Sequence, residues 1–165
     1  MEPVKKSFTL HAIGSVQADE EKGAFFLKID EPFRGALAQL DQFSHVMVFW
    51  WADKMDEPQY REIITAQLPY APGLKAGVFA CRSEYRPNPI ALTTTMVLEV
   101  DQENGLVIVP WMDAMDGTPI IDLKPYIPCT DRIRDVRVAP WMAEWPEWME
   151  DAGEYFAQHA VDFGE

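Results

Sequence analysis

The sequence predicts a mainly β protein, and three observations lead to that class. Most apolar segments have the length of a strand and lack the period of a helix. Glycine, proline and asparagine residues that form turns separate these segments at short intervals. A G-x-G-x-x-G turn and a β–α–β alternation are both missing, which disfavours the parallel dinucleotide-binding fold. We therefore expect strands with a few short helices.

The first strands are expected near the N-terminus. Apolar and polar residues alternate over residues 7–13, which predicts a strand that ends or bulges at Gly14. The polar composition of residues 16–23 predicts a loop. Residues 24–29 are apolar without a helical period, so they are interpreted as the second strand.

The next segments mix short helices with one buried strand. Residues 36–40 are expected to form one or two helical turns, and residues 46–51 form an apolar run that predicts a strand buried on both faces or in a barrel wall. Asp56 is a candidate N-cap, because acidic residues and proline suit a first helical turn. The helix that it begins is expected to end near residue 67.

Two strands are expected around a polar corner in the middle of the chain. Residues 78–81 are interpreted as a buried strand that leads into the corner, and residues 91–100 as a long strand that leaves it. Asn104-Gly105 is the clearest hairpin signal, and it is expected to turn that strand onto residues 106–109. Residues 120–123 are interpreted as a further short strand.

The C-terminal part differs in character. Pro146 suits a first helical position, and a helix is predicted over residues 147–160, packed on the β core by its aromatic face. We expect one domain over residues 1–165, with a core at about 7–138 and a tryptophan-rich helical extension at about 139–165. The tryptophans are interpreted as a cover for the core rather than as a ligand site.

Composition narrows the class of protein further. The chain has 165 residues, of which 48% are hydrophobic, and no apolar run reaches the length of a membrane span. Cys81 and Cys129 show neither metal spacing nor a disulfide framework, which suits a cytoplasmic protein. Fourteen basic and 27 acidic residues give a net charge of −13, which disfavours a polyanionic partner such as tRNA. The alternative is a local basic face on an acidic protein.

The corner itself joins charge to rigidity. Arg82 and Arg86 precede Pro87-Asn88-Pro89, and two prolines around one residue restrict the backbone on both sides. Polar loops held by a rigid scaffold usually serve binding. The alternative is that the arginines only pair with some of the many acids.

Three ordered motifs carry a resemblance. Residues 82–90 read R-S-E-Y-R-P-N-P-I, residues 113–126 read D-A-M-D-G-T-P-I-I-D-L-K-P-Y, and residues 43–51 read F-S-H-V-M-V-F-W-W. Together they resemble the TsaA/TrmO-like family of S-adenosylmethionine-dependent tRNA methyltransferases over about residues 10–130. The resemblance implies a single-domain β-barrel, a homodimer, S-adenosyl-L-methionine as cofactor, and N6-methylation of threonylcarbamoyladenosine at position 37 of tRNA.

The resemblance also implies roles for particular residues. The matching cofactor positions are Lys54, Arg82, Ser83, Arg86, Pro87, Asn88, Pro89, Leu92, Asp113, Ala114, Met115 and Asp116. The matching substrate positions are Asp122, Lys124 and Tyr126, for which a structural ion pair of Asp122 with Arg86 or Lys124 is the alternative. Asp53 and Tyr85 are candidate general bases, because the threonylcarbamoyl group makes the N6–H more acidic.

Three departures from the family pattern concern the substrate more than the cofactor. Ala91 stands where the family usually has glycine, and Asp53-Lys54 stands where it often has a histidine. The Pro-Arg-Gln element that often follows the first strand is missing. Two other functions therefore stay open, namely methylation of a small molecule and non-catalytic binding of a nucleotide.

The remaining histidines and cysteines are interpreted as structural. His45 opens an apolar strand and is expected to bond within the fold. No cluster of metal ligands is apparent, so no metal site is expected. Cys81 lacks a histidine pattern that would support a nucleophile and is expected to be a buried thiol.

Overall fold

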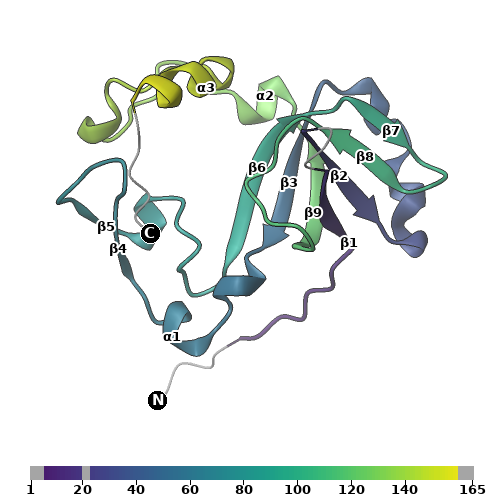
Figure 1. The fold of residues 1–165 in the computed structure, drawn as a ribbon, viewed down its shortest axis with the longest axis horizontal. Coiled ribbons are helices and arrows are strands. Elements are labelled where there is room, and N and C mark those ends of the chain that lie inside the picture. The colour runs from purple at the N-terminus through teal and green to yellow at the C-terminus, as the bar shows by residue number, and fades with distance from the viewer. Residues whose placement is uncertain (1–5, 20–22, 160–165) are drawn as a thin grey trace.

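A computed structural model describes residues 6–19 and 23–159 of the chain, and its main element is a seven-stranded antiparallel sheet (Figure 1). The strands follow the spatial order β6-β3-β9-β1-β2-β8-β7. Their bounds are β1 (Gly14–Asp19), β2 (Ala24–Ile29), β3 (His45–Trp51), β6 (Ile90–Met96), β7 (Glu99–Asp101), β8 (Leu106–Val109) and β9 (Pro119–Pro125). The expected mainly β class with few short helices is confirmed.

A small hairpin and short helices surround this sheet. The hairpin pairs β4 (Thr65–Gln67) with β5 (Lys75–Gly77) and lies beside the main sheet, with a C-terminal helix above it (Figure 1). The α-helices are α1 (Pro58–Arg61), α2 (Pro128–Asp131) and α3 (Met149–Gln158), and the 3-10 helices are η1 (Glu31–Leu37), η2 (Leu40–Gln42), η3 (Asp53–Met55), η4 (Val78–Ala80) and η5 (Pro140–Met142). No helix in the described ranges is long and apolar enough to cross a membrane.

One hydrophobic core joins distant strands of the sheet. Val16, Leu27, Val48, Val107 and Ile120 are fully buried in a single cluster, and they come from five different strands. Since strands β3 and β8 stand far apart in the hydrogen-bonded order, the sheet must curve for them to share one core. Alternate residues of β3 are buried, so one face of this strand is covered and the other is only half-buried.

The ends of the curved sheet are close in sequence. Strands β6 and β7 lie at opposite ends of the hydrogen-bonded order, yet only Val97 and Leu98 separate them. The Val97 backbone N–H donates to the Ser44 carbonyl next to β3, and the Leu98 N–H donates to Ile108 of β8, at 2.9 Å each. Closure into the expected barrel nevertheless stays a prediction.

The expectation for the N-terminal strand is wrong. Residues 7–13 have no regular structure, Phe8 and Leu10 are exposed, and β1 begins at Gly14, where the strand was expected to end. The loop expected over residues 16–23 is therefore wrong up to Asp19, and residues 20–22 lie outside the described residues. Alternation shows only that a segment could form a strand. Here the neighbouring strands pair instead with the segment that follows residue 13.

Two predictions around the polar corner are also wrong. The helix begins at Pro58 with Glu57, not Asp56, as its N-cap, and it ends at Arg61, while residues 65–67 belong to β4. The expected strand over residues 78–81 is a 3-10 turn, in which Val78 is buried while Phe79 is 83% exposed. A strand of this apolar composition needs a neighbour to pair with, and the structure offers one only to residues 75–77.

The hairpin prediction is confirmed at its turn and wrong in its extent. Gly105 has a φ of +68°, and the Asn104 backbone N–H donates to the Asp101 carboxylate at 3.0 Å. Strand β7 forms this hairpin with β8, whereas β6 pairs with β3 over its whole length.

The C-terminal helix exists, but it packs elsewhere than expected. The Phe156 ring contacts Trp145 at 4.9 Å, and Trp145 contacts Tyr70 beside the β4–β5 hairpin at 5.0 Å. The aromatic face of α3 therefore packs on the hairpin region and not on the sheet. The helix begins at Met149, after Pro146 and Trp148, and residue 160 of the expected range lies outside the described residues.

Candidate functional site

The polar corner between η4 and β6 is held by hydrogen bonds from its own arginine. The Arg86 guanidinium donates to the Ser83 carbonyl at 3.0 Å and to the Cys81 carbonyl at 3.5 Å. The Tyr85 backbone N–H donates to the Ser83 hydroxyl at 3.2 Å. Because these bonds close the loop on itself, Arg86 acts first as its internal brace.

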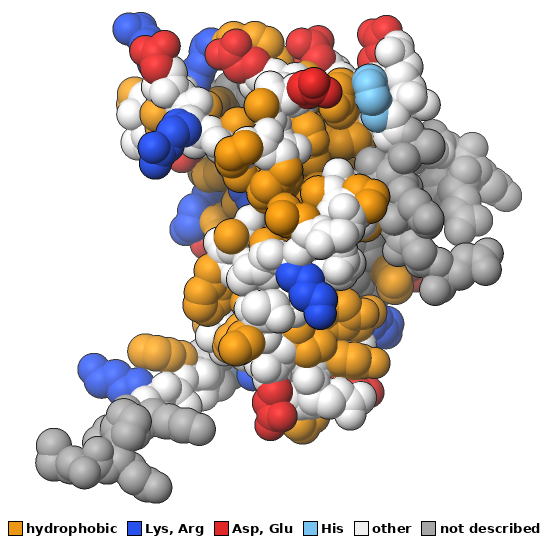
Figure 2. Space-filling view, turned by 90° about the vertical axis from the view of Figure 1, so that its left-hand side faces the viewer, with side chains coloured by type: hydrophobic (Ala, Val, Ile, Leu, Met, Phe, Trp, Pro, Cys, Tyr) orange, Lys and Arg blue, Asp and Glu red, His pale blue; other side chains and the backbone are white. Residues whose placement is uncertain are grey.

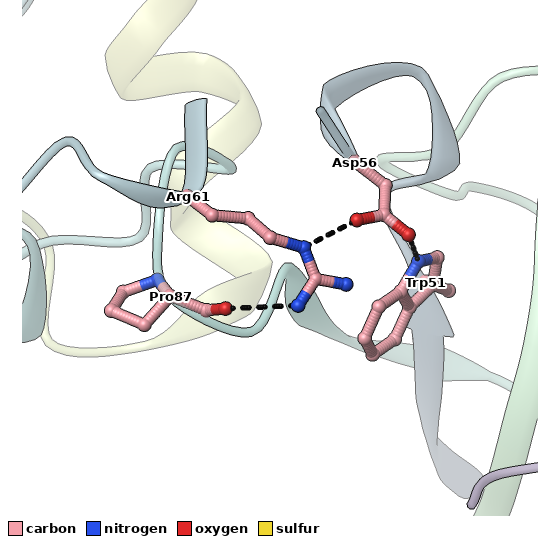
Figure 3. Close-up of polar contacts among 4 residues, drawn as sticks. All are labelled: Trp51, Asp56, Arg61 and Pro87. Atoms are coloured by element: carbon pink, nitrogen blue, oxygen red, sulfur yellow. Dashed lines mark hydrogen bonds and ion pairs between the residues drawn. The ribbon is translucent and has the colours of Figure 1, made fainter. Parts of the chain in front are cut away.

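A second arginine fixes the corner from outside (Figure 3). Arg61 donates from Nε to the Asp56 carboxylate at 2.5 Å and from its terminal nitrogen to the Pro87 carbonyl at 3.3 Å. The other Asp56 oxygen accepts from Trp51 Nε1 at 2.9 Å. The end of β3, helix α1 and the corner are thereby tied together, and Pro89, which directly precedes β6, is fully buried.

The first prediction concerns this tie. The hydrogen bond from Arg61, with smaller help from Trp51 and the Arg61 charge, lowers the pKa of Asp56 despite some desolvation. A lowered pKa in the folded state means stabilisation that is present above the ordinary aspartate value of about 3.9 and is lost as the pH falls below it. Asp56→Asn should therefore lower the melting temperature near neutral pH, and the difference should vanish in acid.

Thermal melts of both proteins across pH test this prediction. Asp41→Asn is a matched control, since Asp41 is an exposed carboxylate for which the described residues provide no side-chain partner. A difference between native protein and Asp56→Asn that does not shrink in acid would show that the carboxylate charge is not what matters.

Three sequence motifs meet around one cavity of about 310 Å³, here called the motif cavity. Helix η3 contributes Asp53, Lys54 and Met55, and the corner contributes Glu84. The loop before β9 contributes Asp113, Ala114 and Met115. The complete lining is Trp50, Ala52, Asp53, Lys54, Met55, Glu84, Met112, Asp113, Ala114, Met115 and Thr118.

The motif cavity carries an excess of negative charge. The Lys54 ammonium lies 3.3 Å from the Asp53 carboxylate, so one acid is partly compensated. Asp113 as a residue is exposed, but it lines the cavity, and its carboxyl group is partly desolvated there. Desolvation, and then the charge of Glu84, raises the pKa of Asp113. A cationic or hydroxyl-bearing ligand would relieve this repulsion.

The expected site residues divide between the motif cavity and other places. Asp53, Lys54, Asp113, Ala114 and Met115 line the cavity, which supports the grouping of those motifs. The corner residues Arg82, Ser83, Tyr85, Arg86, Pro87, Asn88 and Pro89 surround Glu84 in sequence but are not part of the lining. Asp116 accepts instead from the Ala18 backbone N–H at 3.0 Å and so ties the loop to β1.

The expected substrate residues lie on the outer face of the sheet. The Asp122 and Lys124 side chains form an ion pair at 2.7 Å, and Lys124 Nζ stands 5.8 Å from the Phe49 ring centroid. Tyr126 follows β9 and contacts the His45 ring edge-on at 6.4 Å. Leu92, which was expected to contact the cofactor, also lies away from the cavity: it pairs in register with Phe49 and is half-buried. None of the four lines the motif cavity.

Several residues of the cavity were not anticipated. Glu84 occupies a variable position of the R-S-x-x-R motif, so its letter carries no signal, although its position in a binding loop does. Trp50 and Thr118 enter the lining because β3 and β9 are neighbours, which sequence spacing does not reveal.

The expectations for the other polar side chains can be compared with contacts. His45 Nδ1 lies 2.9 Å from the Ser44 hydroxyl, which confirms an internal bond. Cys81 is half-buried, with its thiol 3.8 Å from the Val78 carbonyl. Within residues 6–19 and 23–159, no group of three or more His, Cys, Asp or Glu side chains could hold a metal ion.

Fold and cavity define a small antiparallel β protein with an acidic pocket formed by loops at one end of the sheet. The chain belongs to a known family of this class. The family model described as the tRNA-methyltransferase O N-terminal domain matches residues 11–132, and so includes all three motifs.

Curated relatives fall into two groups. An S-adenosyl-L-methionine-binding protein of Archaeoglobus fulgidus is 34% identical over 110 residues, which are 67% of this chain and 74% of that protein. A probable S-adenosyl-L-methionine-binding protein of Halobacterium salinarum is 35% identical, over 66% of this chain and 81% of its own. The tRNA (adenine(37)-N6)-methyltransferase of Escherichia coli is 35% identical over 61% of this chain, but the match spans only 43% of the enzyme.

Solved structures confirm the fold. A crystal structure of TrmO superimposes with a TM-score of 0.64 at 24% identity and covers 93% of this chain and 76% of its own. TrmO from Pseudomonas aeruginosa gives 0.63 at 23% identity, with the same coverage of both chains. At this identity the likeness extends to architecture alone.

Proposed function

We propose that this protein is an S-adenosylmethionine-dependent methyltransferase that modifies N6 of the adenosine at position 37 of tRNA, with the motif cavity as its cofactor site. The observation that carries the proposal is the convergence of three motifs of the family on one acidic cavity. The names of the relatives, which refer to the cofactor and to the tRNA adenine, support it.

The residues of the motif cavity fit this cofactor. Its sulfonium and amino groups are cationic, and Asp53, Glu84 and Asp113 provide three carboxylates. Lys54 can pair with the carboxylate of the methionine part, and Asp113 can accept from ribose hydroxyls. The volume of 310 Å³ lies at the lower limit of small-molecule pockets, so the site leaves part of the ligand uncovered.

The chain has to position the acceptor and remove one proton. When bound, the cofactor would supply an electrophilic methyl group, whose bond to the sulfonium sulfur breaks so that the neutral thioether departs. As the bond between N6 and the methyl carbon forms, the proton on N6 must pass to a base. We assign this role to Asp53, because it lines the cavity, while Tyr85 packs against Tyr60 with ring centroids 5.3 Å apart. A threonylcarbamoyl group on N6 would make this proton easier to remove.

Methyl transfer tests the assignment. With tRNA that carries threonylcarbamoyladenosine, Asp53→Asn should lower kcat by about a hundredfold, the lower range for loss of a general base. The affinity for S-adenosylmethionine should fall much less than kcat, since Lys54, Glu84 and Asp113 remain. Asp41→Asn is the control for a change of charge elsewhere. Full turnover by Asp53→Asn would transfer the role of base to another group.

A non-catalytic cofactor-binding protein is the second candidate. Two of the relatives are named only for binding S-adenosyl-L-methionine, and the charge of −13 suits tRNA poorly. This candidate predicts cofactor binding without methyl transfer. A small-molecule methyltransferase instead predicts transfer without tRNA affinity at any salt concentration, whereas a tRNA enzyme loses affinity steeply as salt rises.

Closure of the sheet into a barrel belongs to the same proposal. Residues 90–101 would act as one bent strand, because their first part pairs with β3 and their last part with β8. The hydrogen bonds of Val97 and Leu98 toward these two strands support continuous pairing through the bend.

A homodimer with the cavity near its interface is also proposed. Ile64 and Phe79, which flank the β4–β5 hairpin in the chain, expose 71% and 83% of their surface. Figure 2 shows apolar side chains gathered on the face that carries this hairpin. Met115 lines the cavity yet is 62% exposed, so a partner subunit could cover both the hairpin face and this side chain. Light scattering should give twice the chain mass, and Phe79→Asp should give monomers with weaker cofactor binding. A native monomer with full cofactor affinity would contradict this.

A further inference from the structure

A second hollow lies at the other end of the sheet from the motif cavity. It has a volume of about 490 Å³ and is lined by Pro128, Cys129, Arg132 and Arg134, so it is here called the basic hollow. These residues belong to α2 and the segment that follows it, near the start of α3 (Figure 1). No acidic residue takes part in this lining.

Among residues 6–19 and 23–159, the two arginines of the basic hollow have no acidic partner. Ion pairs in the described part of the chain engage Lys54, Arg61 and Lys124, and none reaches Arg132 or Arg134. This is unexpected in a chain with 27 acidic and 14 basic residues. Two guanidinium groups that find no acidic partner in the described part of the chain, despite this excess of acids, are available to an external anion.

Aromatic contact orients one of these groups. The Arg132 guanidinium carbon stands 4.2 Å from the Trp148 ring centroid. The face of the guanidinium group therefore packs on the ring, while the N–H groups at its edge remain able to donate to an acceptor. An adjoining pocket of about 530 Å³ shares both arginines and adds His45, Tyr126 and Trp148. Guanidinium groups next to exposed rings are typical of sites for single-stranded nucleic acid.

Acidic residues restrict where a phosphate can bind. The adjoining pocket also includes Asp131, Asp135, Glu147 and Glu150. Asp131 is engaged, because its carboxylate accepts from the Ile127 backbone N–H at 2.7 Å. The other three repel phosphate, so the anion is directed to the basic hollow and bases to the pocket beside it.

The spacing suits one RNA ligand for both sites. Strand β3 begins at His45, beside the adjoining pocket, and runs to Trp50 in the wall of the motif cavity. At about 3.3 Å per residue, these ends are about 17 Å apart. A single strand of a few nucleotides can span this distance.

We propose that Arg132 and Arg134 bind backbone phosphates of the RNA substrate in the basic hollow, a few nucleotides from the methylated adenosine. The inference rests on the proposed function for the identity of the RNA. Arg134 and Trp148 lie beyond residue 132, where the family match ends, so the C-terminal extension completes the site. Such a site reconciles RNA binding with a net charge of −13, because only a local face has to be basic.

Fluorescence anisotropy with a labelled anticodon stem-loop RNA tests the inference across a series of salt concentrations. Loss of two phosphate contacts should reduce the salt-dependence slope by about 1.4, at about 0.7 for each contact with a single strand. Arg132→Ala/Arg134→Ala should therefore weaken binding, by at least about tenfold for each charge-assisted contact. Arg134→Glu alone should weaken it as well, and this variant leaves the Arg132–Trp148 contact in place.

Arg137→Ala is the matched control, since Arg137 is exposed on the same segment but lines neither hollow. Native affinity and slope in Arg134→Glu would overturn the inference, as would an equal loss in Arg137→Ala. Failure of the native protein to bind the RNA at low salt would also overturn the inference. Cofactor titration separates the two proposals: the arginine variants should bind S-adenosylmethionine normally, whereas failure of the native protein to bind it would defeat the proposed function alone.

Discussion

Asp113→Asn is expected to weaken S-adenosylmethionine binding by about 10- to 100-fold, the range for loss of a hydrogen bond to a charged group. The same change should leave the protein as stable as before, or more stable, at neutral pH. Desolvation and Glu84 raise the pKa of Asp113, so its ionised form is less favourable in the folded state than in the unfolded chain. This cost is absent in strong acid and develops as the pH rises above the ordinary aspartate value of about 3.9.

Calorimetric titration and thermal melts, carried out on the same samples, separate these two effects. A lower affinity with an unchanged or higher melting temperature indicates that the Asp113 carboxylate serves ligand binding and does not stabilise the fold. Asp122→Asn is the matched control, because this carboxylate pairs with Lys124 on the outer face of the sheet. Unchanged affinity in Asp113→Asn would remove Asp113 from the cofactor site.

Among substitutions that add one methyl group to a strand of the sheet, Gly14→Ala should be the most destabilising. A Cβ atom at this position would overlap the Lys28 carbonyl oxygen and stand 2.9 Å from the Ile29 Cα, and both are backbone atoms. Gly14 pairs with Ile29 on one side and Ile120 on the other, so neither neighbour can withdraw without loss of pairing. We expect a loss of about 3 kcal/mol or more, or about 10 °C in melting temperature.

Gly35→Ala provides the control for this experiment. Nothing lies within 4 Å of a Cβ at Gly35, and its φ is not positive. Its melting temperature should stay close to the native value. Native stability in Gly14→Ala would mean that β1 does not approach β2 and β9 in the register described here.

The sequence predicted the strands that carry strong local signals. Residues 24–29 and 46–51 and the Asn104-Gly105 turn were located correctly, because composition and turn chemistry agree there with tertiary pairing. The three motifs also predicted which segments meet at the cavity, with Asp53, Lys54 and Asp113 among its walls.

The remainder depends on long-range pairing that no local pattern contains. Residues 7–13 alternate as a strand should, yet Gly14 alone permits the close approach to Lys28 that fixes where β1 begins. Residues 78–81 are apolar but lack a strand partner, so they turn and expose Phe79. Likewise, the aromatic face of α3 predicted that the helix packs on its neighbours but not on which surface, since Phe156 contacts Trp145, which contacts Tyr70.

A crystal structure of the native protein with S-adenosylhomocysteine tests the central claim most directly. The account predicts density for the ligand in the motif cavity, with its ribose near Asp113 and its methionine part between Lys54 and Glu84. Density confined to another pocket, such as the basic hollow at Arg132 and Arg134, would contradict the assignment. A cavity that stays empty at saturating ligand would contradict it equally.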